Sequence, residues 1–241
     1  MSHNWRKQTL CKRIIPTILC RGYNVVKGRQ FSADRVVGNV KQTVEVYNMR
    51  WVDELVVFDV EARKEGRCIR PDFVSEIASI NFIPLTVGGG IVNSDEARGL
   101  IQAGADKVAI GYQPQFSYLV REIADDMGSQ AIVACINYLD EREALDAAKS
   151  AQKSGAGEII LQSIMKDGMM TGYDLQTAFH VSASIDIPVV LSCGAGTYEH
   201  LYQGLQVADA VAAGAMWTFT DSTPREAKKY LKERGVEVRV V

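Results

Sequence analysis

This 241-residue sequence lacks long apolar runs and any excess of charge of one sign. No stretch approaches the roughly 18 consecutive apolar residues of a membrane span, and the polar start MSHNWRKQTLCK is too poor in apolar residues for a secretory signal. The 27 Lys and Arg residues are balanced by 29 Asp and Glu residues, without the basic stripe that a nucleic-acid backbone requires. We therefore expect a cytoplasmic protein that binds neither nucleic acid nor membrane.

Histidine is scarce and cysteine is dispersed. The three histidines stand far apart, and the five cysteines contain no C-x-x-C pair. Metal cages and disulfide frameworks both need such residues at close, regular spacings. The sequence therefore predicts reduced thiols, no metal site and no cofactor.

Short β-branched runs alternate with amphipathic stretches of helical period along the whole chain. This alternation is typical of parallel strands joined by crossover helices. The predicted strands are Arg13–Leu19, Glu54–Asp59, Ile83–Val87, Lys107–Ile110, Ala131–Ile136, Glu158–Leu161, Ile187–Leu191 and Ala210–Ala213. The predicted helices are Asp34–Met49, Arg70–Ser79, Ser94–Gln102, Pro114–Asp126, Glu141–Lys153, Asp174–Ser184, Tyr198–Val207 and Pro224–Arg234. Eight such units predict an α/β fold, a (β/α)8 TIM barrel, as one domain over residues 1–241 with a polar N-terminal extension at 1–12.

The two halves of the chain repeat weakly. The segment FIPLTVGGGIVNSDEARGLIQAGADKVAIG from Phe82 returns in register as DIPVVLSCGAGTYEHLYQGLQVADAVAAG from Asp186. Pro84 and Pro188 therefore lie 104 residues apart, and a second matched pair of segments has the same offset. The repeat predicts two fused half-barrels, each with a glycine-rich turn after its third strand.

These turns, Gly88-Gly89-Gly90 and Cys193-Gly194-Ala195-Gly196, leave two interpretations open. At the C-terminal ends of barrel strands, glycine-rich turns let backbone N–H groups surround an oxyanion. Glycine also permits close packing of neighbouring backbone segments. Their duplication at matched positions favours two phosphate sites on opposite sides of one barrel mouth.

A series of motifs along most of the chain resembles the HisF family, the cyclase subunits of imidazole glycerol phosphate synthase. In order, these are RIIP from Arg13, VVKG from Val25, DELVVFD from Asp53, IPLTVGGGI from Ile83, AGADKVAI from Ala103, GSQAIV from Gly128, GAGEIIL from Gly155, DG from Asp167, GYD from Gly172 and GAGTYEH from Gly194. The resemblance implies a barrel that pairs with a HisH-like glutaminase and uses its ammonia.

Both acid–base positions of the family are changed in this sequence. The family has an aspartate near the end of the first strand and another at the end of the fifth, where this chain has Leu19 and Asn137. Leucine cannot transfer a proton, and an amide has no useful pKa near neutrality. We therefore expect little cyclase activity of the family type.

Other family positions around the mouth are also altered. By resemblance, an asparagine and a threonine of a phosphate loop fall at Gly111 and Tyr112, and a phosphate-binding serine falls at Ala215. A threonine near the reacting centre falls at Gln162, and a long insertion after the fifth strand is missing. A canonical bisphosphate substrate would therefore lose several contacts.

Several mouth residues of the family are retained. Lys27, which lies on a mobile loop in the family, Asp59 and Asp167 are candidates for new catalytic roles. Candidate contacts of a phosphorylated or sugar-like ligand are Gly89, Gly90, Gly111, Asp167, Gly168, Gly194, Gly196, Gly214 and Ala215.

Four charged residues, Arg13, Glu54, Lys107 and Glu158, each begin a predicted strand. At that position side chains converge inside the bottom of a barrel, so one interpretation is a salt-bridged plug. The resemblance implies instead an ammonia gate at the glutaminase-docking face, with Asp106 in the partner interface. Such a channel needs a narrow uncharged bore because ammonium is costly to desolvate, and Leu19 is compatible with that bore.

The leading hypothesis is a HisF-like synthase subunit that channels ammonia from a HisH-like glutaminase. The resemblance to a divergent HisF branch points to acetamidino formation on a surface-polysaccharide sugar, together with a separate N-acetyl-sugar amidotransferase. The alternatives are the cyclase of histidine biosynthesis, a non-catalytic activator of a glutaminase, and an orphan barrel. Among the remaining residues, we expect Trp217 to pack between helix and barrel, and we expect Lys228, Lys229 and Lys232 to form a solvated helix face.

Overall fold

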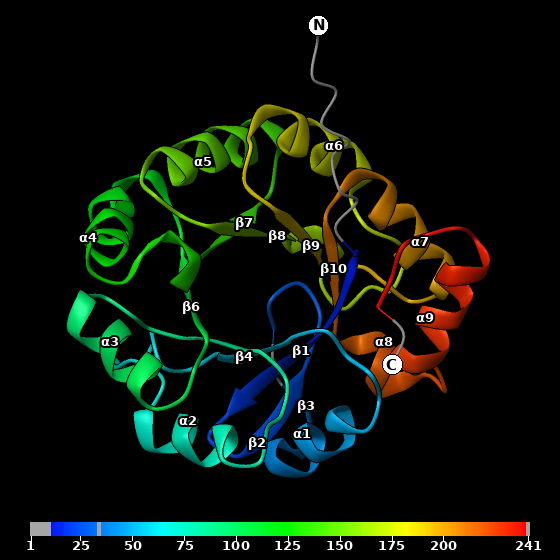
Figure 1. The fold of residues 1–241 in the computed structure, drawn as a ribbon, viewed down its shortest axis with the longest axis horizontal. Coiled ribbons are helices and arrows are strands. Elements are labelled where there is room, and N and C mark those ends of the chain that lie inside the picture. Colours follow the sequence, from blue (N-terminus) through cyan, green and yellow to red (C-terminus); the bar gives the residue numbers. More distant parts are fainter. Residues whose placement is uncertain (1–10, 33–34, 240–241) are drawn as a thin grey trace, which may run out of the picture.

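The computed structural model describes residues 11–32 and 35–239, and its centre is a closed barrel of parallel strands surrounded by helices (Figure 1). In order around the barrel the strands are β1 (Arg13–Arg21), β4 (Leu55–Asp59), β5 (Leu85–Gly88), β6 (Lys107–Gly111), β7 (Ile132–Tyr138), β8 (Glu158–Ser163), β9 (Val189–Ser192) and β10 (Ala210–Ala213). Strand β10 pairs in parallel with β1, and this pairing closes the sheet. The predicted (β/α)8 barrel is confirmed.

The helices follow the strands on the outside of the barrel. They are α1 (Val40–Asn48), α2 (Pro71–Ala78), α3 (Ser94–Gln102), α4 (Ser117–Met127), α5 (Glu141–Lys153), α6 (Leu175–Ser184), α7 (Tyr198–Val207), α8 (Ala215–Phe219) and α9 (Pro224–Glu233). Most begin at a capping side chain, as at Asn93, Asp140, Asp174 and Thr197. Among the described helices, none has both the length and the hydropathy to cross a bilayer.

An antiparallel hairpin extends β1 beyond the barrel, and it was not predicted. Strands β2 (Asn24–Lys27) and β3 (Arg35–Asn39) pair with each other, and β2 pairs with β1. The helix predicted from Asp34 is wrong over residues 35–39, because β-branched Val36 and Val37 favour the extended pairing with β2. Asp34 and residues 1–10 of the predicted N-terminal extension lie outside the described residues.

Two classes of side chain alternate along each strand, as the pleat requires. One class packs outward against the helices, as Ile14 and Ile18 do on β1. The other class fills the barrel interior with a separate apolar cluster: Ile15, Val56, Ala109, Val133, Cys135, Ile160, Val190, Ala210 and Ala212. The barrel is therefore packed through its middle, with the ends left for polar side chains.

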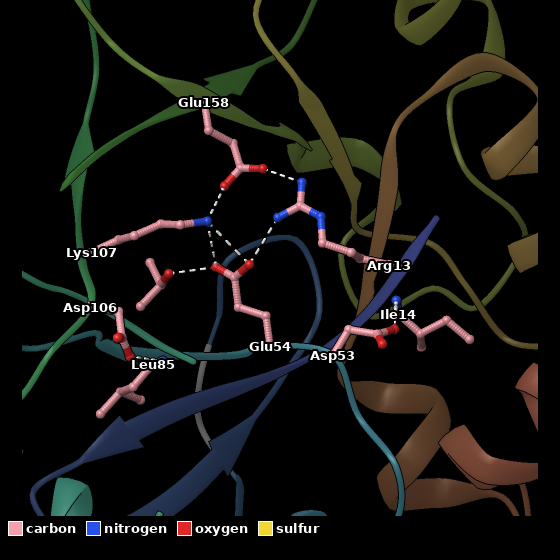
Figure 2. Close-up of polar contacts among 9 residues, drawn as sticks. Arg13, Ile14, Asp53, Glu54, Leu85, Asp106, Lys107 and Glu158 are labelled. Atoms are coloured by element: carbon pink, nitrogen blue, oxygen red, sulfur yellow. Dashed lines mark hydrogen bonds and ion pairs between the residues drawn. The ribbon is translucent and has the colours of Figure 1, made fainter. Parts of the chain in front are cut away.

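Three carboxylates, each just ahead of a strand in the sequence, accept hydrogen bonds from backbone N–H groups near the start of the neighbouring strand. Asp106 accepts from the N–H of Leu85 at 2.7 Å, and Asp209 accepts from the N–H of Val189 at 3.0 Å. Leu85 and Val189 lie 104 residues apart, so the two halves use the same device. Asp53 accepts from the N–H of Ile14 at 2.8 Å in the same way (Figure 2). These carboxylates fix the register at the bottom of the barrel.

A buried ion pair joins the last helix to this end of the barrel. Lys228 on α9 donates to Asp53 at 2.5 Å, and their side chains are only 1% and 6% exposed. The expectation of a solvated face is therefore wrong at Lys228, because its amine completes the bonding of the Asp53 carboxylate. Lys229 does lie at the surface, where it pairs with exposed Glu226.

Replacing Lys228 with methionine is expected to lower the free energy of unfolding by about 3 to 5 kcal/mol. The change leaves the Asp53 carboxylate buried without its cation, and breaking a buried pair costs about this much. Urea unfolding followed by circular dichroism measures the effect. Lys229→Met is the matched control and should change stability by less than about 1 kcal/mol, since its pair is exposed. Equal effects of the two substitutions would contradict the importance of the buried pair.

Candidate functional site

Four charged side chains meet inside the bottom of the barrel, as the sequence predicts (Figure 2). Arg13 bonds Glu54 at 2.9 Å and also bonds Glu158, while Lys107 bonds Glu158 at 2.7 Å and Glu54 at 3.2 Å. Each cation therefore bridges both carboxylates, and the four groups form a closed ring. We refer to Arg13, Glu54, Lys107 and Glu158 as the charged ring.

Burial and charge act in opposite directions on the charged ring. Burial favours the neutral form of Glu158, but the hydrogen bonds and charges of Arg13 and Lys107 outweigh it and hold the pKa of Glu158 below its ordinary value. Burial likewise opposes the charge of Arg13, yet Glu158 and Glu54 raise the pKa of Arg13 above its ordinary value. The Arg13–Glu158 contact is therefore ionic at neutral pH.

Thr86 on β5 is a further member of this site that sequence analysis missed. Its hydroxyl donates to Glu54 at 2.6 Å, and its side chain is completely buried. The signal that could have found it is its place in the barrel, since Thr86 pairs in register with Lys107. Thr86 orients the carboxylate that both cations share.

Above the charged ring, the interior is apolar. Its cluster contains aliphatic side chains and Cys135, whose thiol has a raised pKa because of burial. No carboxylate or ammonium belongs to this middle layer among the described residues. The interior therefore offers a neutral molecule a less unfavourable path than an ion.

At the opposite end, a cavity of about 50 Å³ lies in the barrel mouth. The predicted site residues that line it are Leu19, Lys27, Asp167, Gly168, Gly194, Gly214 and Ala215. The remaining predicted ligand contacts, Gly89, Gly90, Gly111 and Gly196, do not line it, and neither does Asp59. The structure thus brings most candidates of the second half together with Leu19 and Lys27 of the first, and leaves the first glycine turn, Gly111, Asp59 and Gly196 outside the cavity lining.

Lys27 is the buried cation of the mouth. Its residue is 6% exposed, and its amine donates to the carbonyl oxygen of Thr17 at 3.0 Å. Burial lowers the pKa of Lys27 to about 8, although the negative charge of Asp167 acts in the opposite direction. Its amine also lies against Gly214, where a Cβ would come within 2.4 Å of Nζ.

The loop after Lys27 folds over Asp167. The backbone N–H of Gln30 donates to the Asp167 carbonyl at 2.9 Å, and the N–H of Phe31 donates to its carboxylate at 3.0 Å. Gly168 packs against the carbonyl of Gly28, so a side chain there would collide with this loop. Asp167 therefore holds the loop in place over the mouth.

Asp59 has a structural role in this conformation. It bonds Arg67 at 2.7 Å and accepts from the backbone N–H groups of Glu61 and Ala62 at 3.1 and 3.2 Å. These contacts shape the loop between β4 and α2. These side-chain bonds are all within one loop, which favours a scaffolding role over the predicted catalytic one.

The glycine turns also make close backbone contacts. A Cβ at Gly90 would overlap the Arg67 carbonyl, and one at Gly194 would overlap the Gly172 carbonyl. Both glycines have positive φ, 68° and 114° respectively, so the two halves use the same geometry. The N–H of Gly196, a predicted ligand contact, donates to His200 at 3.2 Å. Close packing therefore accounts for these glycines without a bound anion.

The two positions of the missing carboxylates lie in the top layer of the barrel. Leu19 lines the mouth cavity on β1, two residues beyond Thr17, which lines the same cavity. Asn137 follows Cys135 of the interior cluster by two residues on β7, so the pleat directs both to the same face. Neither position carries an ionisable group.

Cys193 is another residue of the mouth that the sequence analysis did not single out for function. Its φ is 71°, unusual for a residue with a side chain, and its thiol donates to Asp167 at 3.5 Å. Burial, followed by the charge of Asp167, raises the pKa of Cys193 well above its ordinary value. The thiol is therefore a neutral donor to Asp167.

Replacing Lys27 with methionine is expected to stabilise the protein at pH 7 by up to about 3 kcal/mol, less the loss of the bond to Thr17. In the folded state the pKa of Lys27 is about 8, whereas an unfolded lysine titrates near its ordinary value of 10.5. The destabilisation caused by burying the charged amine reaches its full size below pH 8 and disappears as the pH rises toward 10.5. Urea midpoints of both proteins between pH 7 and 10.5 measure this difference.

The difference in unfolding free energy between Lys27→Met and the wild type should narrow across that range. The reason is that the wild-type amine becomes neutral at a lower pH in the folded state than in the unfolded state. Lys149→Met is a suitable control, since Lys149 is exposed on α5. It should give a gap that does not change with pH. A gap for Lys27→Met that stays constant from pH 7 to 10.5 would show that burial does not lower the pKa of Lys27.

Comparison with known proteins places the chain in a family. Residues 13–221 match the family model described as "Histidine biosynthesis protein". The imidazole glycerol phosphate synthase subunit HisF of Chlorobium phaeobacteroides (strain BS1) is 41% identical, over 96% of this chain and 100% of the relative. The HisF subunit of Dictyoglomus thermophilum is 40% identical, over 96% of this chain and 99% of the relative. At this identity over nearly the whole length, the chain belongs to the HisF family.

Proposed function

We propose that this chain is the synthase subunit of a glutamine-dependent complex, which receives ammonia at the charged ring and passes it through the barrel to the mouth. The observation that carries the proposal is the contrast between the two ends. The bottom has four paired charges around the axis, whereas the mouth has Leu19 and Asn137 where acid–base groups would be needed. One end of the barrel is thus suited to the entry of ammonia, and the other end lacks the proton-transfer groups of the family type.

The partner at the bottom is a HisH-like glutaminase. The relatives are named as subunits of a synthase, and Asp106 is exposed at the same end as the charged ring. The N–H of Leu85 donates to one Asp106 oxygen (Figure 2), and the other oxygen has no donor among the described residues, which leaves it available to a docked protein. With a glutaminase docked at this end, ammonia released by the partner would enter the barrel at the charged ring.

The acceptor is the N-acetyl group of a surface-polysaccharide sugar, converted into an acetamidino group with a separate N-acetyl-sugar amidotransferase. In this assignment, sugar activation takes place on the amidotransferase, so the barrel needs no acid–base pair at its mouth. The mouth cavity of about 50 Å³ is too small for a sugar in this conformation. Exposed apolar side chains in the loops that follow β7 and β8, Leu139, Met165 and Met169, supply a surface for the second partner.

Replacing Arg13 and Lys107 with alanine is expected to uncouple ammonia transfer from glutamine hydrolysis. The changes leave Glu54 and Glu158 unpaired at the entry, so ammonia should escape or be blocked there. With a HisH-like glutaminase from the same genome, the ammonia released into solution per glutamine hydrolysed measures the effect. The released fraction should rise several-fold, whereas Lys149→Ala, an exposed change on α5, should leave it unchanged.

Two results would contradict this assignment. If no glutaminase from the genome forms a complex with the chain, the proposed route of ammonia has no source. If the ring variants stimulate the glutaminase normally and release no additional ammonia, the chain is a non-catalytic activator and the barrel is not a channel.

The second candidate function is the cyclase step of histidine biosynthesis. It is favoured by the 41% identity with a HisF subunit over 96% of the chain. In that case Lys27 or Asp167, which line the mouth cavity, would perform the proton transfers. The cyclase would then proceed without the paired carboxylates on which acid–base catalysis of this kind depends.

Wild-type protein is not expected to restore growth of a histidine auxotroph that lacks its HisF subunit. The double change Leu19→Asp with Asn137→Asp should raise cyclase activity measurably, because it places carboxylates in the top layer of the barrel. Growth without histidine, together with cyclase assays of the purified proteins, provides the measurement. Growth supported by the wild-type chain would establish histidine biosynthesis and overturn the sugar assignment.

A further inference from the structure

A second cavity, of about 290 Å³, lies beside the barrel mouth. It is bounded by β1, the β2–β3 hairpin, α1 and α8 (Figure 1). Ile18 lines this cavity and packs outward from β1, so the cavity lies on the helix side of the barrel wall. We refer to it as the side cavity. It was not predicted from the sequence because the hairpin that bounds it was assigned to a helix.

The side cavity is lined by two cationic side chains. They are Lys27 and Arg50, and among the described residues no Asp or Glu lines the cavity. Arg50 is half-buried and Lys27 is 6% exposed, and neither forms an ion pair with a carboxylate of the described residues. The bond from the Lys27 amine to Thr17 uses only one of its three N–H donors.

Hydrogen-bonding side chains surround these two cations. Asn39, Gln42 and Thr43 line the side cavity from the start of α1, and Trp217 forms its wall on α8. Trp217 is 7% exposed, and its indole N–H has no hydrogen-bond partner among the residues that the structure describes. Buried polar groups are generally satisfied in native proteins, so an unpartnered indole N–H in a residue that borders the cavity is unusual.

A buried ammonium without a counter-ion is unfavourable by several kcal/mol, and a bound anion removes most of that penalty. Burial lowers the pKa of Lys27 to about 8 even though the charge of Asp167 acts against it, so the amine is not fully compensated by the described residues. The volume of about 290 Å³ lies at the lower end of the range for small-molecule sites. Charge, donors and volume together define a site for a small anionic group.

We propose that the side cavity is a binding site for the oxyanion of a small metabolite, a carboxylate or a phosphate monoester, held by Lys27, Arg50 and Gln42. The site is separate from the mouth cavity, but Lys27 lines both. An anion bound in the side cavity would keep Lys27 charged and draw its amine toward α1. Occupancy of the side cavity would thereby change the charge presented to the mouth.

The test uses the indole N–H signal of Trp217 in the intact chain, identified in ¹H–¹⁵N spectra by its loss in Trp217→Phe. Inorganic phosphate and succinate serve as separate probes, with chloride added to keep ionic strength constant. We expect the Trp217 signal to shift in a saturable manner with at least one probe, and the stronger probe identifies the class of oxyanion. The indole signal of Trp51, which stacks on Arg225 at 4.1 Å, should not move.

Two substitutions locate the site. Arg50→Gln removes a cation from the side cavity, and Gln42→Glu places a carboxylate in it without a change of shape. Each should weaken binding by at least about tenfold. Arg50→Gln removes a charge-assisted hydrogen bond to the anion, and the carboxylate of Gln42→Glu repels the anion. Arg225→Gln is the matched control, because it removes an arginine that stacks on Trp51 and does not line the side cavity.

The proposal is overturned if the Trp217 signal does not move with either probe while the protein remains folded. It is also overturned if binding is unaffected by Arg50→Gln and Gln42→Glu, since the anion would then occupy the mouth. Neither result bears on ammonia transfer, because the charged ring lies at the other end of the barrel. The two proposals can therefore fail independently.

Discussion

The parallel pairing of β10 with β1 is the interaction on which the rest of the structure depends. Four register pairs, from Arg13 with Ala210 to Pro16 with Ala213, close the sheet. Closure gives the strands a common interior, so every second residue of each strand has no access to solvent except at the two ends. Polar groups are then acceptable only at these ends. The charged ring and the mouth are consequences of that restriction.

The two ends satisfy their polar groups in different ways. At the bottom, each cation bridges two carboxylates and Thr86 completes Glu54, so the charges balance within the site. At the mouth, Lys27 donates only to a carbonyl oxygen, and the nearest negative charge, on Asp167, is engaged by the N–H of Phe31 and the thiol of Cys193. The bottom is therefore closed by ion pairs in the isolated chain, whereas Lys27 and Asp167 line the mouth without an ion pair between them among the described residues.

Sequence analysis predicted the features that depend on periodicity and missed those that depend on tertiary contact. The alternation of strands and helices predicted the barrel, and the first residues of four strands predicted the charged ring. The β2–β3 hairpin was missed because Val36 and Val37 continue into a helical pattern, and only their pairing with β2 decides between the two structures. Lys228 was assigned to the surface because its partner, Asp53, lies 175 residues away. The glycine turns were open to two interpretations because packing and anion binding require the same residue.

The order of the charged ring, the apolar cluster and the mouth along the barrel axis determines the chemistry of the proposed channel. Ammonia and ammonium exchange rapidly in water, but in the proposed channel the apolar cluster above the charged ring would admit only the neutral molecule without a large desolvation penalty. A molecule that enters from solvent must first pass Arg13 and Lys107, whose side chains are 26% and 23% exposed and already occupied by both glutamates. The pairing of these cations with both glutamates closes the axis. The proposed ammonia route therefore requires a rearrangement of the ring, and a protein docked at the face that bears Asp106 would be in a position to cause one. Along that route, Leu19 would extend the apolar lining to the mouth, as far as Lys27.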